Sequence, residues 1–189
     1  MNISAVLLAG GESRRMGKDK ATHLFHEKPL WQIQLDLLRK LEPAEMFVSA
    51  RSDPSWRPDD VQFVADDPPS RGPLSGLAAS LDRIRTSYLL ALAIDMPLMS
   101  ETYLRFLFSY RELGRGVLPL LDNRAEPLAA IYPQEVNIDF HSALAGTDFS
   151  LQTLTSRLIN SGRLRTIVVS DEAREFFVNV NQPADVQSG

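Results

Sequence analysis

The sequence predicts an α/β fold in which a mainly parallel sheet lies between two layers of helices. Short apolar stretches alternate with helical patterns over the first two-thirds of the chain, which is typical of an open parallel sheet. Residues 88–94 contain almost no polar side chain, as expected for a strand that is buried on both faces. A glycine-rich loop follows the first apolar stretch, at the end of a strand where such sheets bind ligands.

The patterns place the elements in order. The first strand is expected at residues 3–8, and the first helix begins at Pro29, a favoured first helical position. Leucine and isoleucine recur at three and four residues from there to Leu41, so one face of this helix is apolar. Ser100 is expected to cap a later helix. The remaining expected strands are residues 46–48, 61–65, 88–94, 117–121, 129–132 and 164–169, with a short extended stretch at 176–180, and the remaining helices are 72–84, 100–112, 134–145 and 151–159.

Length and composition fit a single three-layer αβα, Rossmann-like domain that spans residues 1–189. The net charge of −4 implies no large basic face, which argues against a nucleic-acid partner. The chain has no cysteine, so disulfides and thiolate metal sites are excluded. No stretch approaches the roughly 18 apolar residues of a membrane span. The N-terminus also lacks the basic start of a signal peptide, so we expect a cytoplasmic protein without membrane contact.

The loop after the first strand has the composition of a polyphosphate site. Gly10 and Gly11 permit positive φ and a close approach of a ligand to the backbone. Successive N–H groups form a nest for anions, and cationic side chains add full charges. Neither a Walker A loop nor a dinucleotide fingerprint has its spacing here. The alternative is a surface turn whose charges are only solvated. The cations in question are Arg14, Arg15, Lys18 and Lys20.

Polar residues at two other places are candidates for the same site. Asp95 directly follows the buried strand and offers the hard oxygen that Mg²⁺ prefers, although an aspartate here could also cap a turn. Asn179 and Asn181 point to one side of an extended chain, or else form an Asx turn. The three histidines do not share metal-ligand spacing. Trp31 and Trp56 have no cationic or aromatic partner in any motif.

The stretch Leu8-Ala9-Gly10-Gly11-x-Ser13-x-Arg15-Met16-Gly17-x-Asp19-Lys20 resembles the signature of the molybdenum cofactor guanylyltransferases, the MobA family of α/β nucleotidyltransferases. The resemblance extends from the first strand to Asp185. It implies transfer of GMP from GTP to the terminal phosphate of molybdopterin or Mo-molybdopterin, with Mg²⁺ as cofactor and release of pyrophosphate. It also implies transient contact with molybdoenzyme maturation proteins. The alternatives are a nucleotidyltransferase that uses CTP or another phosphorylated acceptor, and a non-catalytic nucleotide-binding homologue.

The resemblance also implies roles for single residues. Asp95 would be the metal ligand. Asp66 or Asp67 would contact guanine, because one carboxylate can accept from both the N1–H and the amine of that base. Spacing does not decide between these two aspartates, and the alternative is that they belong to a solvated acidic loop. Asn179 and Asn181 would face the pterin. The family often has an asparagine at the end of its second strand, where this chain offers Ser49 or Ser52 instead. Arg71 would contact a phosphate or be exposed. The expected GTP-binding residues are Leu8, Ala9, Gly10, Gly11, Lys20, Asp66, Asp67, Gly72 and Asp95, and the expected catalytic residues are Lys20, Arg14, Arg15 and Asp95.

Overall fold

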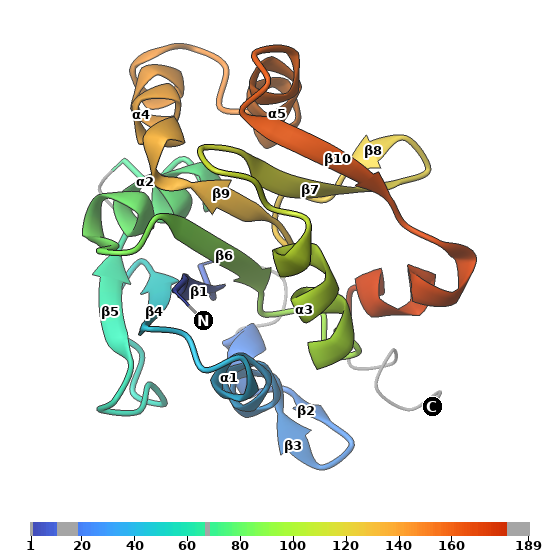
Figure 1. Ribbon diagram of the computed structural model, residues 1–189. Coiled ribbons are helices and arrows are strands. Elements are labelled where there is room, and N and C mark those ends of the chain that lie inside the picture. The colour runs from blue at the N-terminus through green and yellow to red at the C-terminus, as the bar shows by residue number, and fades with distance from the viewer. Residues whose placement is uncertain (1, 11–18, 67–68, 181–189) are drawn as a thin grey trace.

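A central sheet of eight strands organises the computed structural model, which describes residues 2–10, 19–66 and 69–180 (Figure 1). Its order is β10-β7-β9-β6-β1-β4-β5, with β8 paired to β7. All neighbours pair in parallel except those of β9 and β8, so the sheet is mostly parallel, as predicted. The strands are β1 (Ser4–Leu8), β4 (Glu45–Ala50), β5 (Gln62–Ala65), β6 (Tyr88–Ala93), β7 (Gly116–Leu121), β8 (Arg124–Ala125), β9 (Ile131–Pro133) and β10 (Leu164–Val168).

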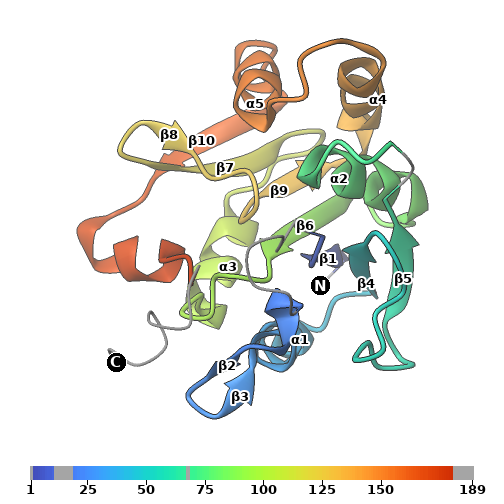
Figure 2. The same cartoon turned by 180° about the vertical axis from the view of Figure 1, so that it is seen from behind.

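Helices cover both faces of this sheet, which confirms the three-layer α/β fold class (Figures 1 and 2). One face packs on α1 (Leu30–Lys40), α3 (Glu101–Ser109) and the 3₁₀ helix η3 (Asp171–Phe177). The other face packs on α2 (Pro73–Arg83), α4 (Asn137–Ala145) and α5 (Leu151–Asn160). Shorter elements are the 3₁₀ helices η1 (Lys20–Thr22) and η2 (Gln134–Val136), and the hairpin strands β2 (Leu24–Phe25) and β3 (Lys28–Pro29).

The central strand β1 divides its side chains between the two cores. Ala5 and Leu7 belong to the core on the α1 and α3 side, whereas Val6 and Leu8 belong to the core on the α2 side. This alternation follows from the period of two in a strand. All five residues of β1 are buried, because the strand pairs on both edges and helices cover both faces of the sheet. Among the residues that the structure describes, no helix is both long and apolar enough to cross a membrane.

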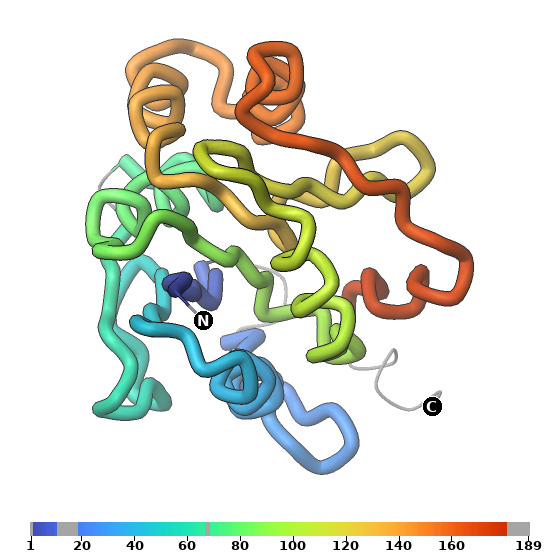
Figure 3. The backbone as a smooth tube through the Cα atoms, in the orientation of Figure 1, coloured from blue at the N-terminus to red at the C-terminus, as the bar shows by residue number. Residues whose placement is uncertain are grey.

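The predicted extended stretch at 176–180 is wrong in its first half. Phe176 and Phe177 end the 3₁₀ helix η3, and both rings lie against Tyr103 of α3, with centroid distances of 5.7 and 5.3 Å. A helical turn brings two successive aromatic rings to one neighbour, whereas a strand would send them to opposite faces. Figure 3 shows how the chain returns from β10 to α3 through this segment.

Smaller differences lie at the ends of the helices. Pro29 occupies the cap position of α1 and not its first turn, because residues 24–29 form the β2–β3 hairpin, which projects beyond α1 (Figure 2). His26 and Glu27 make its turn with φ of 46° and 63°. The helix predicted at 134–145 is divided into η2 and α4. Ser100 caps α3 as predicted, since its Oγ accepts the Tyr103 N–H at 3.0 Å.

The hydroxyl group of Tyr103 generates a stability prediction. The residue is 7% exposed, burial raises its pKa to about 12, and its Oη has no hydrogen-bond partner among the described residues. Tyr103→Phe removes a buried polar group at no cost in hydrogen bonds. We expect the free energy of unfolding, measured in urea, to stay unchanged or rise by up to about 1 kcal/mol.

Tyr132→Phe is the matched control for this variant. Tyr132 is also buried, but its Oη donates to the Pro127 carbonyl at 2.8 Å. Its removal leaves that carbonyl without a donor and should cost about 1–3 kcal/mol. An equal loss of stability in the two variants would contradict the interpretation of Tyr103 as unpartnered.

Candidate functional site

A pocket of about 210 Å³ opens at the carboxyl ends of β1 and β6. From β1 the sheet grows to one side through β4 and β5, whereas β6 pairs with the other side of β1. The strand order therefore reverses between β1 and β6. Open α/β sheets bind their ligands at such a switch point. The lining consists of Leu8, Ala9, Gly10, Asp19, Lys20, Pro73, Ala93, Ile94, Asp95 and Leu128. The structure thus brings together the predicted residues Leu8, Ala9, Gly10, Lys20 and Asp95.

Backbone hydrogen bonds hold the end of β1 in place. Ala9 N donates to Ser49 O at 2.9 Å, and Ile94 N donates to Leu8 O at 3.1 Å. Residues Leu8 and Ala9 are therefore hydrogen-bonded to β4 on one side and to the residue after β6 on the other. At Gly10 an added Cβ would lie 2.9 Å from Asp66 Oδ2, which is closer than real Cβ contacts come. A side chain at this position would push against the Asp66 carboxylate, because the backbone passes close to it.

Lys20 and Asp95 form an ion pair in the lining of the pocket. Lys20 Nζ donates to Asp95 Oδ2 at 2.8 Å, and the two side chains are 21% and 23% exposed. Lys20 is the first residue of η1, and Asp95 follows β6. A lysine has three donors, so Lys20 has the capacity to bind a phosphate oxygen beside Asp95. The pair places one cation and one hard oxygen donor at the same wall of the pocket.

Asp66 lies next to the pocket but does not line it. The residue is 7% exposed, and its Oδ1 accepts the Ser49 hydroxyl at 2.8 Å. Ser70 Oγ lies 3.4 Å from the other carboxylate oxygen. Ser49 therefore fixes the Asp66 carboxylate through its hydroxyl group, whereas Ser52 is exposed. A contact between Asp66 and a base stays a prediction. Gly72, another predicted GTP-binding residue, occupies the N-cap position of α2, where its φ of 66° favours glycine.

Asp95, the expected metal ligand, lines the pocket, but the described residues contain no preformed metal site. No group of three or more His, Cys, Asp or Glu side chains with metal-binding geometry occurs within residues 2–10, 19–66 and 69–180. Asp95 and Asp19 are the carboxylates in the pocket lining. Mg²⁺ is commonly held by one or two carboxylates together with substrate phosphates and water. These residues therefore fit a magnesium ion that arrives with phosphate oxygens.

The C-terminal segment reaches the same end of the sheet. Val180 N donates to the Asp95 carbonyl at 2.9 Å, and the neighbouring Asn179 is exposed. This bond brings the predicted pterin-side residue Asn179 close to the predicted metal ligand. Five predicted residues lie outside the part of the chain that the structure describes: Gly11, Arg14, Arg15, Asp67 and Asn181.

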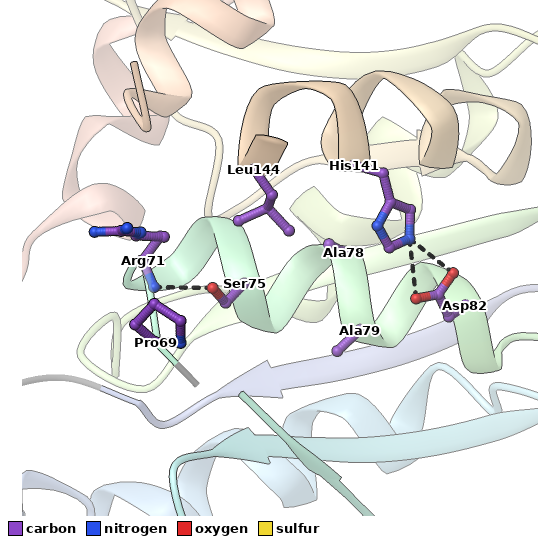
Figure 4. Close-up of a pocket in the computed structure, with 8 residues that line it drawn as sticks. All are labelled: Pro69, Arg71, Ser75, Ala78, Ala79, Asp82, His141 and Leu144. Atoms are coloured by element: carbon purple, nitrogen blue, oxygen red, sulfur yellow. Dashed lines mark hydrogen bonds and ion pairs between the residues drawn. The ribbon is translucent and has the colours of Figure 1, made fainter. Parts of the chain in front are cut away.

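Arg71 lies in a separate hollow and not in the pocket. Its guanidinium lies 4.2 Å from the ring centroid of Phe149. The hollow, about 290 Å³ in volume, lies between α2 and α4 (Figure 4). At its other end His141 Nε2 lies 3.0 Å from Asp82 Oδ1. Of the two possibilities for Arg71, the structure thus supports the exposed one.

Sequence reasoning missed several residues of the site. Trp56 Nε1 donates to Asp19 Oδ2 at 2.7 Å, and its ring stacks on Trp31 with a centroid distance of 5.7 Å. The interpretation of both tryptophans as lacking an aromatic partner is wrong. Asp19 stood in the quoted motif without a role. Leu128 gave no sequence signal, and its place is set in the fold, where its carbonyl accepts the Ala93 N–H at 2.8 Å.

Comparison with known proteins identifies the family. The model of the MobA-like NTP transferase domain matches residues 5–163 of the chain. The chain belongs to this family. It is therefore a nucleotidyltransferase, and the resemblance seen in the motif from Leu8 to Lys20 is confirmed.

Relatives match this MobA-like transferase over almost its whole length. A probable molybdenum cofactor guanylyltransferase of Opitutus terrae is 30% identical over 97% of this chain and 92% of its own. One of Methanothermobacter thermautotrophicus is 30% identical over 97% of each chain. The crystal structure of the molybdopterin-guanine dinucleotide biosynthesis protein A of Archaeoglobus fulgidus is 22% identical, covers 97% of this chain and 95% of its own, and superposes with a TM-score of 0.79. This last likeness supports the fold.

The close packing of Gly76 in this MobA-like transferase generates a prediction. A Cβ at Gly76 would collide with Ser49 Oγ and lie 3.0 Å from Asp66 Oδ1. Gly76→Ala should therefore lower the free energy of unfolding in urea by about 1–3 kcal/mol, the range for overpacking a core. Gly146→Ala is the control, since its nearest neighbour would lie at 3.4 Å and its φ is −89°. Equal stability of the two variants would show that the contact of α2 with Asp66 is loose.

Proposed function

We propose that this chain transfers GMP from GTP to the terminal phosphate of molybdopterin or Mo-molybdopterin. The products are molybdopterin guanine dinucleotide and pyrophosphate. The observation that carries the proposal is the pocket at the switch point, where the Lys20–Asp95 ion pair lies beside the backbone of Gly10. The relatives that match the whole chain are named for guanylyl transfer, which supports the choice of nucleotide and acceptor.

The proposed reaction is an in-line displacement at the α-phosphorus of GTP. An oxygen of the pterin phosphate forms the new bond to phosphorus as the bond to the pyrophosphate oxygen breaks. The acceptor phosphate is already ionised near neutral pH, so no general base is required. The protein must position two anions and stabilise the charge that develops on the leaving pyrophosphate.

Each residue of the pocket has a proposed part in this reaction. Lys20 binds the triphosphate, together with the backbone of Gly10 and Gly11 and with Arg14 or Arg15. Asp95 would hold Mg²⁺, which supplies positive charge to the phosphate oxygens. As a phosphate oxygen takes the donors of Lys20, the Asp95 carboxylate becomes available to the metal. The two side chains are 2.8 Å apart, so a phosphate and its metal ion would contact both.

The base and the acceptor are assigned to opposite sides of the pocket. Asp66 or Asp67 accepts from guanine on the β5 side. Asn179 and Asn181 face the pterin on the side where Val180 binds the Asp95 carbonyl. Residues 1–189 act as one unit in this proposal, with molybdoenzyme maturation proteins as transient partners that receive the product.

Asp95→Asn tests the reaction and the metal together. The change keeps the shape of the side chain but removes its charge, so GTP should still bind, because Lys20 and the loop remain. Pyrophosphate release should fall at least about a hundredfold, the scale of losing one preorganised charge, and added Mg²⁺ should restore only part of it. The measurement is pyrophosphate release against Mg²⁺ concentration for both proteins. Superimposable metal curves would mean that Asp95 is no metal ligand, and no release from the wild type with GTP and molybdopterin would reject the reaction.

Asp66→Asn tests the choice of base. Calorimetric affinities for GTP, ATP and CTP with Mg²⁺ should show the preference for GTP falling about tenfold or more, since a hydrogen bond to a charged group contributes about 1.5–3 kcal/mol. Asp67→Asn measures the alternative assignment. Ser49→Ala is the control, because it removes the support of the carboxylate and keeps the carboxylate itself. Full preference for GTP in both aspartate variants would mean that other groups read the base.

A further inference from the structure

The carboxylate of Asp19 is bound by donors on both of its oxygens. Oδ1 accepts the Ala21 N–H at 3.0 Å, and Oδ2 accepts the indole N–H of Trp56 at 2.7 Å. Asp19 is also the cap of η1, the three-residue helix that begins with Lys20. Such a short 3₁₀ helix has little internal hydrogen bonding to hold it. The cap and the buried Ala21 together hold η1 in place, and the cap is bound to Trp56.

Trp56 is held by contacts that do not involve the pocket. Its ring lies nearly parallel to that of Trp31 on α1, at an interplanar angle of 16°. The next residue, Arg57, donates to both carboxylate oxygens of Asp53 at 2.7 Å. Arg39 of α1 donates to both oxygens of Asp60 at 3.1 Å. The segment between β4 and β5 is thus bound to α1 and also has an ion pair within itself. These contacts fix the position of the Trp56 indole N–H.

The direction of the Asp19 carboxylate matters for ligand binding, because this residue lines the same pocket as Lys20 and Asp95. A loose carboxylate there would repel an anionic ligand and compete for the ammonium group of Lys20. Donors at both oxygens fix the orientation of the carboxylate. The indole N–H of Trp56 is the side-chain donor in this arrangement.

We propose that Trp56 is a positioning residue for Lys20. Its indole N–H fixes Asp19, and Asp19, through the cap of η1, sets where the Lys20 ammonium lies toward the phosphates of a nucleoside triphosphate. Trp56 itself does not line the pocket. The inference rests on the proposed function only for the identity of that ligand as GTP.

Two conservative variants isolate the indole N–H. Trp56→Phe keeps an aromatic ring against Trp31 but has no donor for Asp19. The matched control, Trp31→Phe, changes the other ring of the stack and keeps the donor. Trp56→Phe should lower the affinity for GTP with Mg²⁺, and kcat/KM for pyrophosphate release, by about threefold to tenfold, as for a charge-assisted bond near the surface. Trp31→Phe should change both by less than about twofold.

A double-mutant cycle with Lys20→Ala separates positioning from a general structural role. If Trp56 acts through Lys20, Trp56→Phe should cause no further loss of GTP affinity once Lys20 is alanine. The same fold-loss in both backgrounds would overturn the inference, as would equal effects of the two tryptophan variants. Urea unfolding of each protein completes the cycle, and a loss of affinity that follows only from partial unfolding would also overturn it.

The outcome is distinguishable from failure of the proposed function. If the wild type binds GTP but releases no pyrophosphate with molybdopterin, the proposed reaction is rejected, while the cycle in affinity still decides the role of Trp56. If the wild type binds CTP or ATP better than GTP, the cycle is run with that nucleotide. A wild type that binds no triphosphate with Mg²⁺ overturns both proposals.

Discussion

The parallel pairing of β1 with β4 on one edge and with β6 on the other is the constraint on which the site depends. A strand in this position has its backbone groups bound from both sides, and buried backbone groups must be paired. The pairing continues beyond the strand, where Ala9 N binds Ser49 O and Ile94 N binds Leu8 O. The position at which the glycine loop begins is therefore fixed. Asp95 follows β6, the strand next to β1, and so lies near that position.

Three carboxylates of the described residues lie around this point, and each one is bound to a donor. Asp19 accepts from Trp56, Asp66 accepts from Ser49, and Asp95 accepts from Lys20. A pocket for phosphates must limit the repulsion between its own carboxylates and the ligand. A donor on each carboxylate fixes the direction of its oxygens. The donors come from η1, from β4 and from the segment after β4, so the charge balance depends on the complete fold.

The end of the described chain has to cross the molecule to reach this site. β10 lies at the edge of the sheet, far from β1 in the strand order. The return is made by η3, which packs Phe176 and Phe177 on Tyr103. Val180 then binds the Asp95 carbonyl. An aromatic contact on one face of the sheet thus brings the proposed acceptor side next to the proposed metal ligand.

By itself the sequence determined the fold class, the strand before the glycine loop, and Lys20 and Asp95 as candidate residues. These follow from local properties, namely the period of apolar residues and a contiguous motif. Only the tertiary structure decided that β9 lies antiparallel between β6 and β7, that η3 replaces an extended stretch, and that Ser49 supports Asp66. It also decided that Trp31 and Trp56 stack and that Trp56 donates to Asp19. The physical reason is that these contacts join residues far apart in the chain, whose energies depend on burial and distance in the folded molecule and leave no period or motif in the sequence.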